Sequence, residues 1–495
     1  MSLFSRPLRG LSQSRSGNAP AINFFILRPN HARRALLPLI ALTLIASSTT
    51  RADQVDDYIR QAMQKSRIPG LALAVVKDGT VIKAQGYGVA NLETETPVTP
   101  NTVFELASIT KQFTATAIML LVEEGKVGLD ERISKYLENT PDSWKNITVR
   151  HLLTHTSGLP TLGKDFRSLV WTLEVSTAKM YDAARKDAVG FAAGEKWEYS
   201  DEGYFLLGMI IERVTGQQYA NFLAERIFNP AGMSNTSVLN QYKVIKNRAR
   251  GYTIFHNEVV NIRRDVQVEL PSHYGIMSTA LDLAKWDTAL RSERILKQSS
   301  LKLMWTSARL NSGKTQPYGF GWELDERRGH AIVGHTGITG TEITRFINDG
   351  LTVIVLTNLG SWGKATPDTH STGITTKVAE FYLSDLAYHP IQDRDPQLTA
   401  LVKGLFSQPT GPEWDQKLLT PELWAALQES LNSGQEDLKA LGPLRSIELV
   451  EQQQKDAYQL FRYRLGYDHM SLLVLIAKSS AGKIAGLSMD EDGPD

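Results

Sequence analysis

The sequence predicts an α+β protein in which one antiparallel sheet is flanked by helices and is followed by a small α+β module. Strand patterns occur at both ends of residues 53–388, helical patterns fill the region between them, and a second series of patterns follows residue 396. Strands from the two ends of a domain can share one sheet when helices cover its faces. A length of 495 residues also exceeds the roughly 250–300 at which one core stops growing, so two units are expected.

The first 52 residues are typical of an export signal. Arg33 and Arg34 precede an apolar run at 35–46, and a small polar stretch then ends at Ala52. The run is shorter than the ~20 residues that a membrane helix needs, and it contains Pro38. We therefore expect residues 1–52 to be a signal peptide with a long n-region. The mature protein should be periplasmic or secreted, with no stable membrane span.

Residues 53–388 are predicted to form the larger domain. Alternating or continuous apolar runs indicate strands, and apolar spacing of three to four residues indicates helices. A hairpin turn is expected at Asn348, Asp349 and Gly350. The predicted elements are, in chain order, a helix at 55–63, strands at 71–76, 80–84 and 86–89, a mixed helical region at 108–239, strands at 331–333, 344–347 and 351–356, and a helix at 376–383.

A polar, Pro-containing segment at 389–396 is predicted to be a linker to a smaller domain at 397–495. This second unit shows no catalytic constellation, so we interpret it as an accessory α+β module. Its predicted elements are helices at 398–406 and 421–431 and strands at 447–451, 458–463, 472–476 and 484–487.

Composition excludes several classes of function. Lys and Arg number 54 against 53 Asp and Glu, and the formal net charge is +1. No run of five or more basic residues occurs in the sequence, so binding to nucleic acid or anionic lipid has no support. The chain has no Cys, which removes disulfides, a thiol nucleophile and thiolate metal ligands.

The first chemical motif is Ser108-Ile109-Thr110-Lys111, which follows an extended segment and opens an amphipathic helical run. Residues three apart on a helix lie on one face, so the Lys111 amine should lie over the Ser108 hydroxyl. A serine needs such a base to act as a nucleophile, and a helix N-terminus adds a favourable potential for a developing oxyanion.

Two further motifs could complete a site. Tyr199 stands on a loop just before a helix, where its phenol could relay a proton if Lys111 keeps its pKa low. His335, Thr336, Gly337 and Ile338 end an apolar strand. The Ile338 N–H could complete an oxyanion hole with that of Ser108, while His335 and Thr336 hold a substrate carboxylate or carbonyl.

Taken singly, each motif also fits an ordinary role: a capping Ser with a surface Lys, a packing Tyr, or a turn at a strand end. Together they resemble the serine β-lactamase and penicillin-binding-protein superfamily, in its class C β-lactamase, D-alanyl-D-alanine carboxypeptidase and esterase branch. The resemblance covers residues 53–387. Besides the three motifs it rests on the stretches FELASITKQFTA at 104–115, ITVRHLLTHTSGL at 147–159, GY at 203–204, LG at 207–208, GM at 232–233, GIMSTA at 275–280, DL at 282–283 and YGFGW at 318–322.

The resemblance implies an antiparallel sheet flanked by helices, an all-helical lobe, and an active site between them. It implies that Ser108 is acylated and that Lys111 and Tyr199 share the proton transfers. It implies no metal and no cofactor. The implied substrate is a small molecule or peptide: a β-lactam, an ester or a D-amino-acid peptide, with peptidoglycan fragments among the candidates.

One departure from the family pattern concerns Asp201. The family's second motif ordinarily reads Tyr-x-Asn, whereas this chain reads Tyr199-Ser200-Asp201. An ionised Asp only accepts hydrogen bonds, and close to Lys111 its charge would raise the lysine pKa by roughly 1–3 units. This favours esterase or peptidase activity over β-lactamase activity. Alternatively, Asp201 could turn away and cap the following helix.

Other interpretations remain open at this stage. A catalytically impaired cell-wall-binding protein on the same scaffold is the main alternative to a hydrolase. His151 and His155 have the spacing of paired metal ligands but lack the Glu after the first His that a zinc hydrolase uses as its base. The G-x-S-x-G motif of α/β-hydrolases does not occur.

Overall fold

The computed structural model describes residues 51–161, 163–169, 174–262, 267–360, 372–407, 416–425, 441–455, 457–468 and 471–492. The predicted signal peptide lies outside the described residues except for Arg51 and Ala52, which begin the first helix. Most of the helix predicted at 421–431 also lies outside them.

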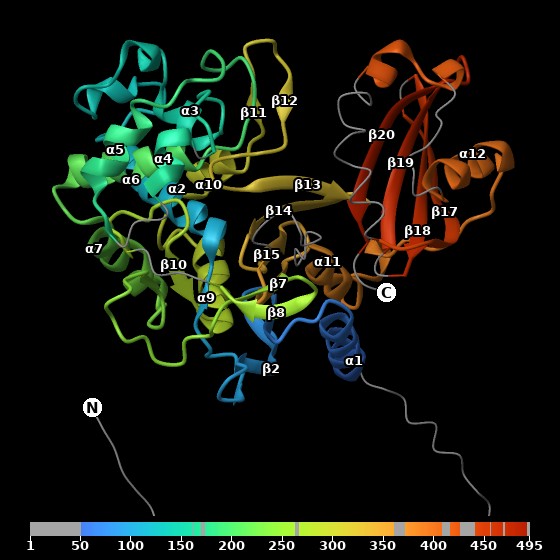
Figure 1. Cartoon of the computed structure of the whole chain (residues 1–495), viewed down its shortest axis with the longest axis horizontal. Helices are drawn as coiled ribbons and strands as arrows, with labels where there is room; N and C mark the ends of the chain where they lie inside the picture. Colours follow the sequence, from blue (N-terminus) through green and yellow to red (C-terminus); the bar gives the residue numbers. More distant parts are fainter. Residues whose placement is uncertain are drawn as a thin grey trace, which may run out of the picture. The chain divides into compact units, whose positions relative to one another are not determined.

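A seven-stranded antiparallel sheet joins strands from both ends of the larger domain, as the sequence predicts (Figure 1). The N-terminal strand β1 pairs with β16 from the C-terminal half, and Leu73 lies opposite Val355. In sheet order the strands are β13 (Glu323–Arg327), β14 (His330–Gly337), β15 (Thr341–Phe346), β16 (Leu351–Thr357), β1 (Gly70–Lys77), β2 (Thr80–Asn91) and β3 (Thr96–Pro97).

Strand β1 is apolar from Leu71 to Val76 because both of its faces are covered there. Successive side chains of a strand point to opposite faces. Ala72 and Ala74 belong to the core that includes helices α2 (Thr110–Glu123) and α9 (Ala280–Arg291). Leu71, Leu73 and Val75 belong to a second core with helices α1 (Arg51–Lys65) and α11 (Thr372–Glu380), which contact each other.

Between β3 and β13 the chain forms most of its helices. The further helices of this region are α3 (Val149–Leu153), α4 (Lys164–Ser168), α5 (Thr177–Ala184), α6 (Asp201–Thr215), α7 (Tyr219–Leu223), α8 (Asn229–Ala231) and α10 (Gln298–Met304), with the 3-10 helices η1 (Ala107–Ile109), η2 (Ile133–Lys135) and η3 (Asp142–Trp144) and the π-helical turn η5 (Ala224–Phe228). These elements form the helical insertion that the sequence predicts.

The insertion also contains short strands that the sequence pattern does not predict, because pieces of two to four residues are too short to show a period. One of these short strands ends two residues before Ser108, and its pairing with a later strand anchors the Ser108 motif. The short strands pair as β4 (Phe104–Glu105), β10 (Ile276–Ser278) and β6 (Ser237–Val238); β5 (Glu174–Val175) and β9 (Gln267–Val268); β7 (Tyr252–Phe255) and β8 (Glu258–Asn261); and β11 (Ala308–Arg309) and β12 (Thr315–Gln316).

The C-terminal module contains a four-stranded antiparallel sheet and helix α12 (Pro396–Ser407), coloured orange to red in Figure 1. Its side chains form a core of their own, in which Val402 of the helix joins Phe461 and Val474 of the sheet. The four predicted strands are thus confirmed. They are β17 (Leu444–Lys455), β18 (Tyr458–Tyr467), β19 (Ser471–Ser479) and β20 (Ile484–Glu491), and two 3-10 helices, η6 (Ser384–Leu386) and η7 (Gln416–Leu418), flank α12 in the chain.

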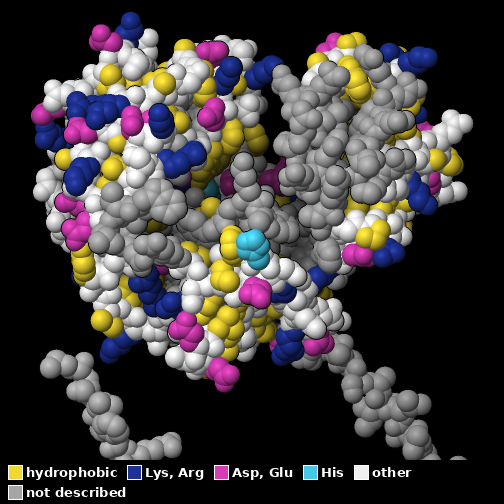
Figure 2. Space-filling view, in the orientation of Figure 1, with side chains coloured by type: hydrophobic (Ala, Val, Ile, Leu, Met, Phe, Trp, Pro, Cys, Tyr) yellow, Lys and Arg dark blue, Asp and Glu magenta, His cyan; other side chains and the backbone are white. Residues whose placement is uncertain are grey.

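Across the described ranges, no helix combines the length and the apolar character needed to cross a bilayer. On the face shown in Figure 2, basic and acidic side chains are interspersed rather than gathered by sign.

Candidate active site

The Ser108 motif begins at a sharp change of direction in the backbone. Strand β4 pairs with β10, and Ala107 then adopts a φ of 47°, a left-handed conformation that is unfavourable for a residue with a Cβ. Helix η1 leads directly into α2, so Ser108 lies at a helix start, as predicted. The Ile276 N–H donates to the Thr110 hydroxyl at 2.9 Å and ties this helix start to β10.

Lys111 is fully buried and places its amine beside the Ser108 hydroxyl. Its Nζ lies 3.3 Å from Ser108 Oγ, 2.6 Å from Asp201 Oδ1 and 2.9 Å from the His273 carbonyl oxygen. Burial lowers the pKa of Lys111 below its ordinary value, while Asp201 and Glu323 oppose that shift. Asp201 therefore raises the Lys111 pKa, as predicted, but the loss of solvation lowers that pKa by more.

Asp201 does not cap helix α6, so the capping alternative is wrong. Ser200 is the N-cap, and its hydroxyl accepts a hydrogen bond from the Gly203 N–H at 3.0 Å. Asp201 occupies the first helical position and directs its carboxylate to Lys111. An Asp in the first turn of a helix is also favoured by the helix dipole.

Tyr199 lies against both Ser108 and Lys111. Its ring centre is 4.7 Å from Lys111 Nζ, and its side chain is hydrogen-bonded to that of Ser108. Burial and the charge of Asp201 raise the pKa of Tyr199 well above its ordinary value, and the Ser108 contact opposes this only in part. The expectation that Lys111 keeps this pKa low is therefore wrong, and Tyr199 holds its proton at neutral pH.

His155 positions the Tyr199 loop, a role that sequence reasoning missed. Its ring stacks on that of Tyr199 with centroids 4.3 Å apart, and its Nδ1 accepts a hydrogen bond from the Ser200 N–H at 3.0 Å. Burial lowers the pKa of His155 well below its ordinary value, so the ring is neutral and can accept that bond. His151 lies apart in the capping box of α3, where the Thr148 N–H donates to its ring.

The strand-end motif lies just beyond the first residue of β13. Glu323, the first residue of β13, is opposite Gly334, so residues 335–337 continue past the edge strand. A Cβ on Gly337 would meet the Leu106 carbonyl oxygen at 2.4 Å, which shows how closely the motif packs beside Ser108. Ile338 follows in the turn and is 41% exposed. The oxyanion hole expected from Ser108 and Ile338 stays a prediction.

His335 is only 2% exposed and pairs with Ile343 of β15. Its Nδ1 is 2.7 Å from the Thr336 carbonyl oxygen, and its Nε2 is 3.0 Å from the Tyr318 hydroxyl. Burial lowers the pKa of His335 to about 3, so the neutral ring donates from Nδ1 and accepts the Tyr318 O–H at Nε2. This placement supports a positioning role for His335 rather than direct contact with substrate.

Glu323 is a second residue that sequence reasoning missed. Its carboxylate accepts from the N–H and the hydroxyl of the half-buried Thr336, and it lies 3.8 Å from His335 Nδ1. Burial raises the pKa of Glu323 to about 7, although 46% of its side chain remains exposed. A usable signal was its position directly after the YGFGW stretch, as the first residue of the strand beside the motif.

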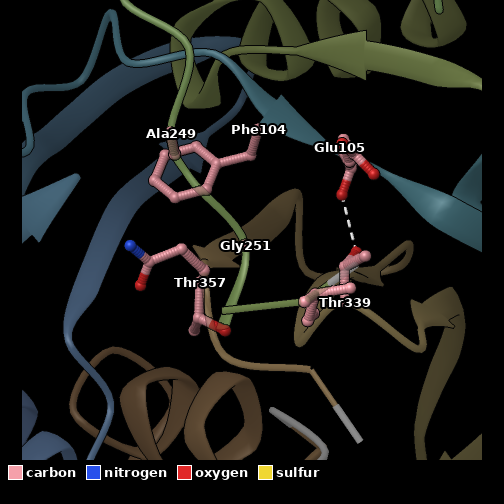
Figure 3. Close-up of a pocket in the computed structure, with 8 residues that line it drawn as sticks. Phe104, Glu105, Ala249, Gly251, Thr339 and Thr357 are labelled. Carbon is pink, nitrogen blue, oxygen red and sulfur yellow. Dashed lines mark hydrogen bonds between the residues drawn. The ribbon is translucent and has the colours of Figure 1, made fainter. Parts of the chain in front are cut away.

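A separate cavity is lined in part by β4 and is too small for a substrate. Phe104, Glu105, Thr339 and Thr357 line it, with a volume of about 20 Å³ (Figure 3). That is room for about one water molecule. The Thr339 hydroxyl donates to the Glu105 carbonyl oxygen at 2.6 Å, which joins the turn after β14 to the strand before Ser108.

Comparison with known proteins shows the family of this chain. The family model described as Beta-lactamase matches residues 55–374. Penicillin-binding protein 4* of Bacillus subtilis is 31% identical over 369 residues, which cover 70% of this chain and 80% of that protein.

Among solved structures, the octameric penicillin-binding protein homologue from Pyrococcus abyssi is similar in fold, with a TM-score of 0.60 and 24% identity over 88% of this chain and 95% of that chain. The D-amino acid amidase from Ochrobactrum anthropi complexed with D-phenylalanine has a TM-score of 0.55 and 26% identity, covering 67% of this chain and 99% of that chain. Both likenesses extend over nearly the whole of the compared structures.

Proposed function

Because this chain belongs to the β-lactamase family, we propose that it is a serine hydrolase that cleaves an amide or ester through an acyl-enzyme on Ser108. The observation that carries the proposal is the buried Lys111 amine, 3.3 Å from Ser108 Oγ, with a pKa below that of a free lysine. A lowered pKa supplies the neutral fraction that a general base needs at neutral pH.

The geometry supports a definite sequence of proton transfers. Neutral Lys111 takes the proton of Ser108 as Oγ attacks the substrate carbonyl, and the resulting oxyanion is stabilised by backbone N–H groups. Tyr199 gives its proton to the leaving nitrogen or oxygen as the scissile bond breaks, and it regains a proton from Lys111. Water then attacks the acyl-enzyme and releases the acid and free Ser108, with the same groups acting in reverse.

The substrate class is narrowed by Asp201 and by the relatives. A Tyr-x-Asn motif offers an amide N–H to the substrate, whereas the Asp201 carboxylate accepts only and is engaged with Lys111. This favours ester or peptide-like amide substrates over β-lactams. The similarity to a D-amino acid amidase supports amides of D-amino acids as the first substrates to assay.

Steady-state hydrolysis tests the proposal. The panel is p-nitrophenyl butyrate, a penicillin and D-phenylalanine p-nitroanilide, assayed with the wild-type protein and with Ser108→Ala, Lys111→Ala and Lys126→Ala. Lys126 is 54% exposed on the surface and serves as the matched lysine control. We expect the first two variants to lose at least 1,000-fold in kcat/KM, about the size of a lost nucleophile or base, and Lys126→Ala to lose nothing.

Turnover that survives Ser108→Ala would overturn the mechanism. A folded wild-type protein that hydrolyses no member of the panel and binds peptidoglycan would support the alternative of an impaired cell-wall-binding protein.

A further inference from the structure

The strand-end motif already has an acidic partner within the chain. Thr336 presents its N–H and its hydroxyl to the Glu323 carboxylate, at the place where a substrate carboxylate or carbonyl was expected. Each of these donors carries one hydrogen, so a substrate carboxylate could take both only after Glu323 leaves them. Glu323 therefore occupies the position of an anionic substrate group and adds its own charge there.

The other charged groups of the site also disfavour a negatively charged substrate. Around the described catalytic groups, the Lys111 amine faces two carboxyl groups, those of Asp201 and Glu323. The site is therefore net negative whenever Glu323 is ionised, and this disfavours a substrate anion. Three neighbouring histidines are neutral at pH 7 because burial lowers their pKa values: His155, His273 and His335.

We propose that Glu323 selects substrates that carry a protonated amine on the acyl side of the scissile bond, namely amides or esters of amino acids with a free α-amino group. This rests on the serine hydrolase function proposed above. The 46% exposure of the Glu323 side chain lets its carboxylate meet a ligand while Thr336 still holds it. A carboxylate has about four acceptor sites, so it can accept from Thr336 and from an ammonium together.

The test compares three substrates that differ only at the amine: D-phenylalanine p-nitroanilide with a free, an N-acetylated or an N-succinylated amino group. The protein is assayed at pH 7.5, where most of a carboxyl group with the Glu323 pKa of about 7 is ionised and most of an α-ammonium with a pKa of about 7.7–8.0 is still protonated. Glu323→Gln removes the charge and keeps the shape. Glu326→Gln is the control on the same strand, because Glu326 is exposed.

We expect the wild type to favour the free amine over the N-acetyl substrate by at least tenfold in kcat/KM, and to disfavour the N-succinyl substrate further. Glu323→Gln should cut the free-amine preference at least tenfold, mainly through KM, and Glu326→Gln should leave it unchanged. Protection of Ser108 from a fluorophosphonate by D-phenylalaninamide but not by its N-acetyl form gives a second readout that does not depend on the release of p-nitroaniline.

Equal use of the three substrates by the wild type, or a preference that Glu323→Gln leaves intact, would overturn the inference. If the fluorophosphonate still labels Ser108 in that case, the serine hydrolase function stands and only the amine selectivity fails. If the folded wild type is not labelled at Ser108, the proposed function fails first and the selectivity fails with it.

Discussion

The contact between Lys111 and Asp201 influences the protonation of the amine that we propose as the general base. Burial of the amine favours the neutral form of Lys111, while Asp201 at 2.6 Å favours the charged form. The two effects partly cancel, and the balance leaves the lysine pKa below its ordinary value. A family member with Asn at this position would lack the opposing charge, so Asp201 tunes the pH range in which Lys111 can accept a proton.

Replacing Asp201 by Asn should move the acidic limb of the pH profile. The change removes a charge that raises the Lys111 pKa, so that pKa should fall and the neutral amine should persist to lower pH. We expect the limb of kcat/KM to shift down by about 1–3 units and the rate on amide substrates to rise. Steady-state kinetics between pH 5 and 9 measure this. An unchanged or upward-shifted limb would contradict the role given to Asp201.

The close packing of the end of strand β14 against its neighbours requires a glycine at position 337. Gly337 leaves no space for a Cβ, since the nearest atoms would be the Leu106 carbonyl oxygen and Thr341 Oγ1, both at 2.4 Å. Backbone atoms cannot move aside cheaply, so a side chain here would push the strand end away from η1. The geometry beside Ser108 thus follows from backbone packing between β14 and the turn before α2.

Gly337→Ala should therefore reduce kcat/KM at least tenfold, because small displacements of reacting groups have large effects on rate. The control is Gly404→Ala in α12, an exposed helical position with nothing within 4 Å of the added Cβ. That variant should gain about 0.5–1 kcal/mol of stability and keep its activity. Thermal melts and assays of both variants check this, and a fully active Gly337→Ala would refute the packing argument.

Helix α6 is joined to the neighbouring loop by a carboxyl group that keeps its proton. Glu202 is fully buried next to Asp201 and accepts the Gly163 N–H at 2.6 Å, while Asp187 lies near its carboxyl group. Burial and the nearby carboxylates raise the pKa of Glu202 to about 8. A protonated Glu202 accepts from Gly163 without adding a charge beside Asp187 and Asp201, whereas an ionised one would add a buried negative charge there.

Stability should therefore fall with rising pH in this region. A raised folded-state pKa means that the folded chain holds a proton the unfolded chain releases, so stability is lost as pH rises from about 4.5 through about 8. Glu202→Gln keeps the acceptor and the donor without titrating. Relative to this variant, the wild type should lose on the order of a few kcal/mol between pH 5 and 8.5.

Denaturant unfolding at both pH values tests this, with Glu258→Gln on the exposed strand β8 as control. Parallel pH profiles for the wild type and Glu202→Gln would show that Glu202 does not titrate as described.

Across the whole molecule, the long helices and strands and the order of the motifs could be predicted from the sequence. These features are encoded by the local periodicity of apolar residues and by the spacing between motif residues. The apolar run of β1 and the serine-to-lysine spacing of three residues are examples. Short strands such as β4 have no period. Contacts between distant residues, such as Glu323 with Thr336 or His155 with Tyr199, depend on the folded chain and left no local pattern.

The pKa of Tyr199 is another property that could not be predicted from the sequence. From the sequence, a nearby lysine was expected to lower it, whereas burial and Asp201 raise it in the folded chain. Desolvation depends on the surroundings in three dimensions, so the sign of such a shift could not be read from residue types alone.

The central claim, an acyl-enzyme on Ser108, is tested most directly by intact-protein mass spectrometry after reaction with a fluorophosphonate. We expect one adduct per chain, which peptide mapping should locate at Ser108 and which should be absent from Ser108→Ala. An adduct that persists in Ser108→Ala, or no adduct on folded wild-type protein, would contradict it.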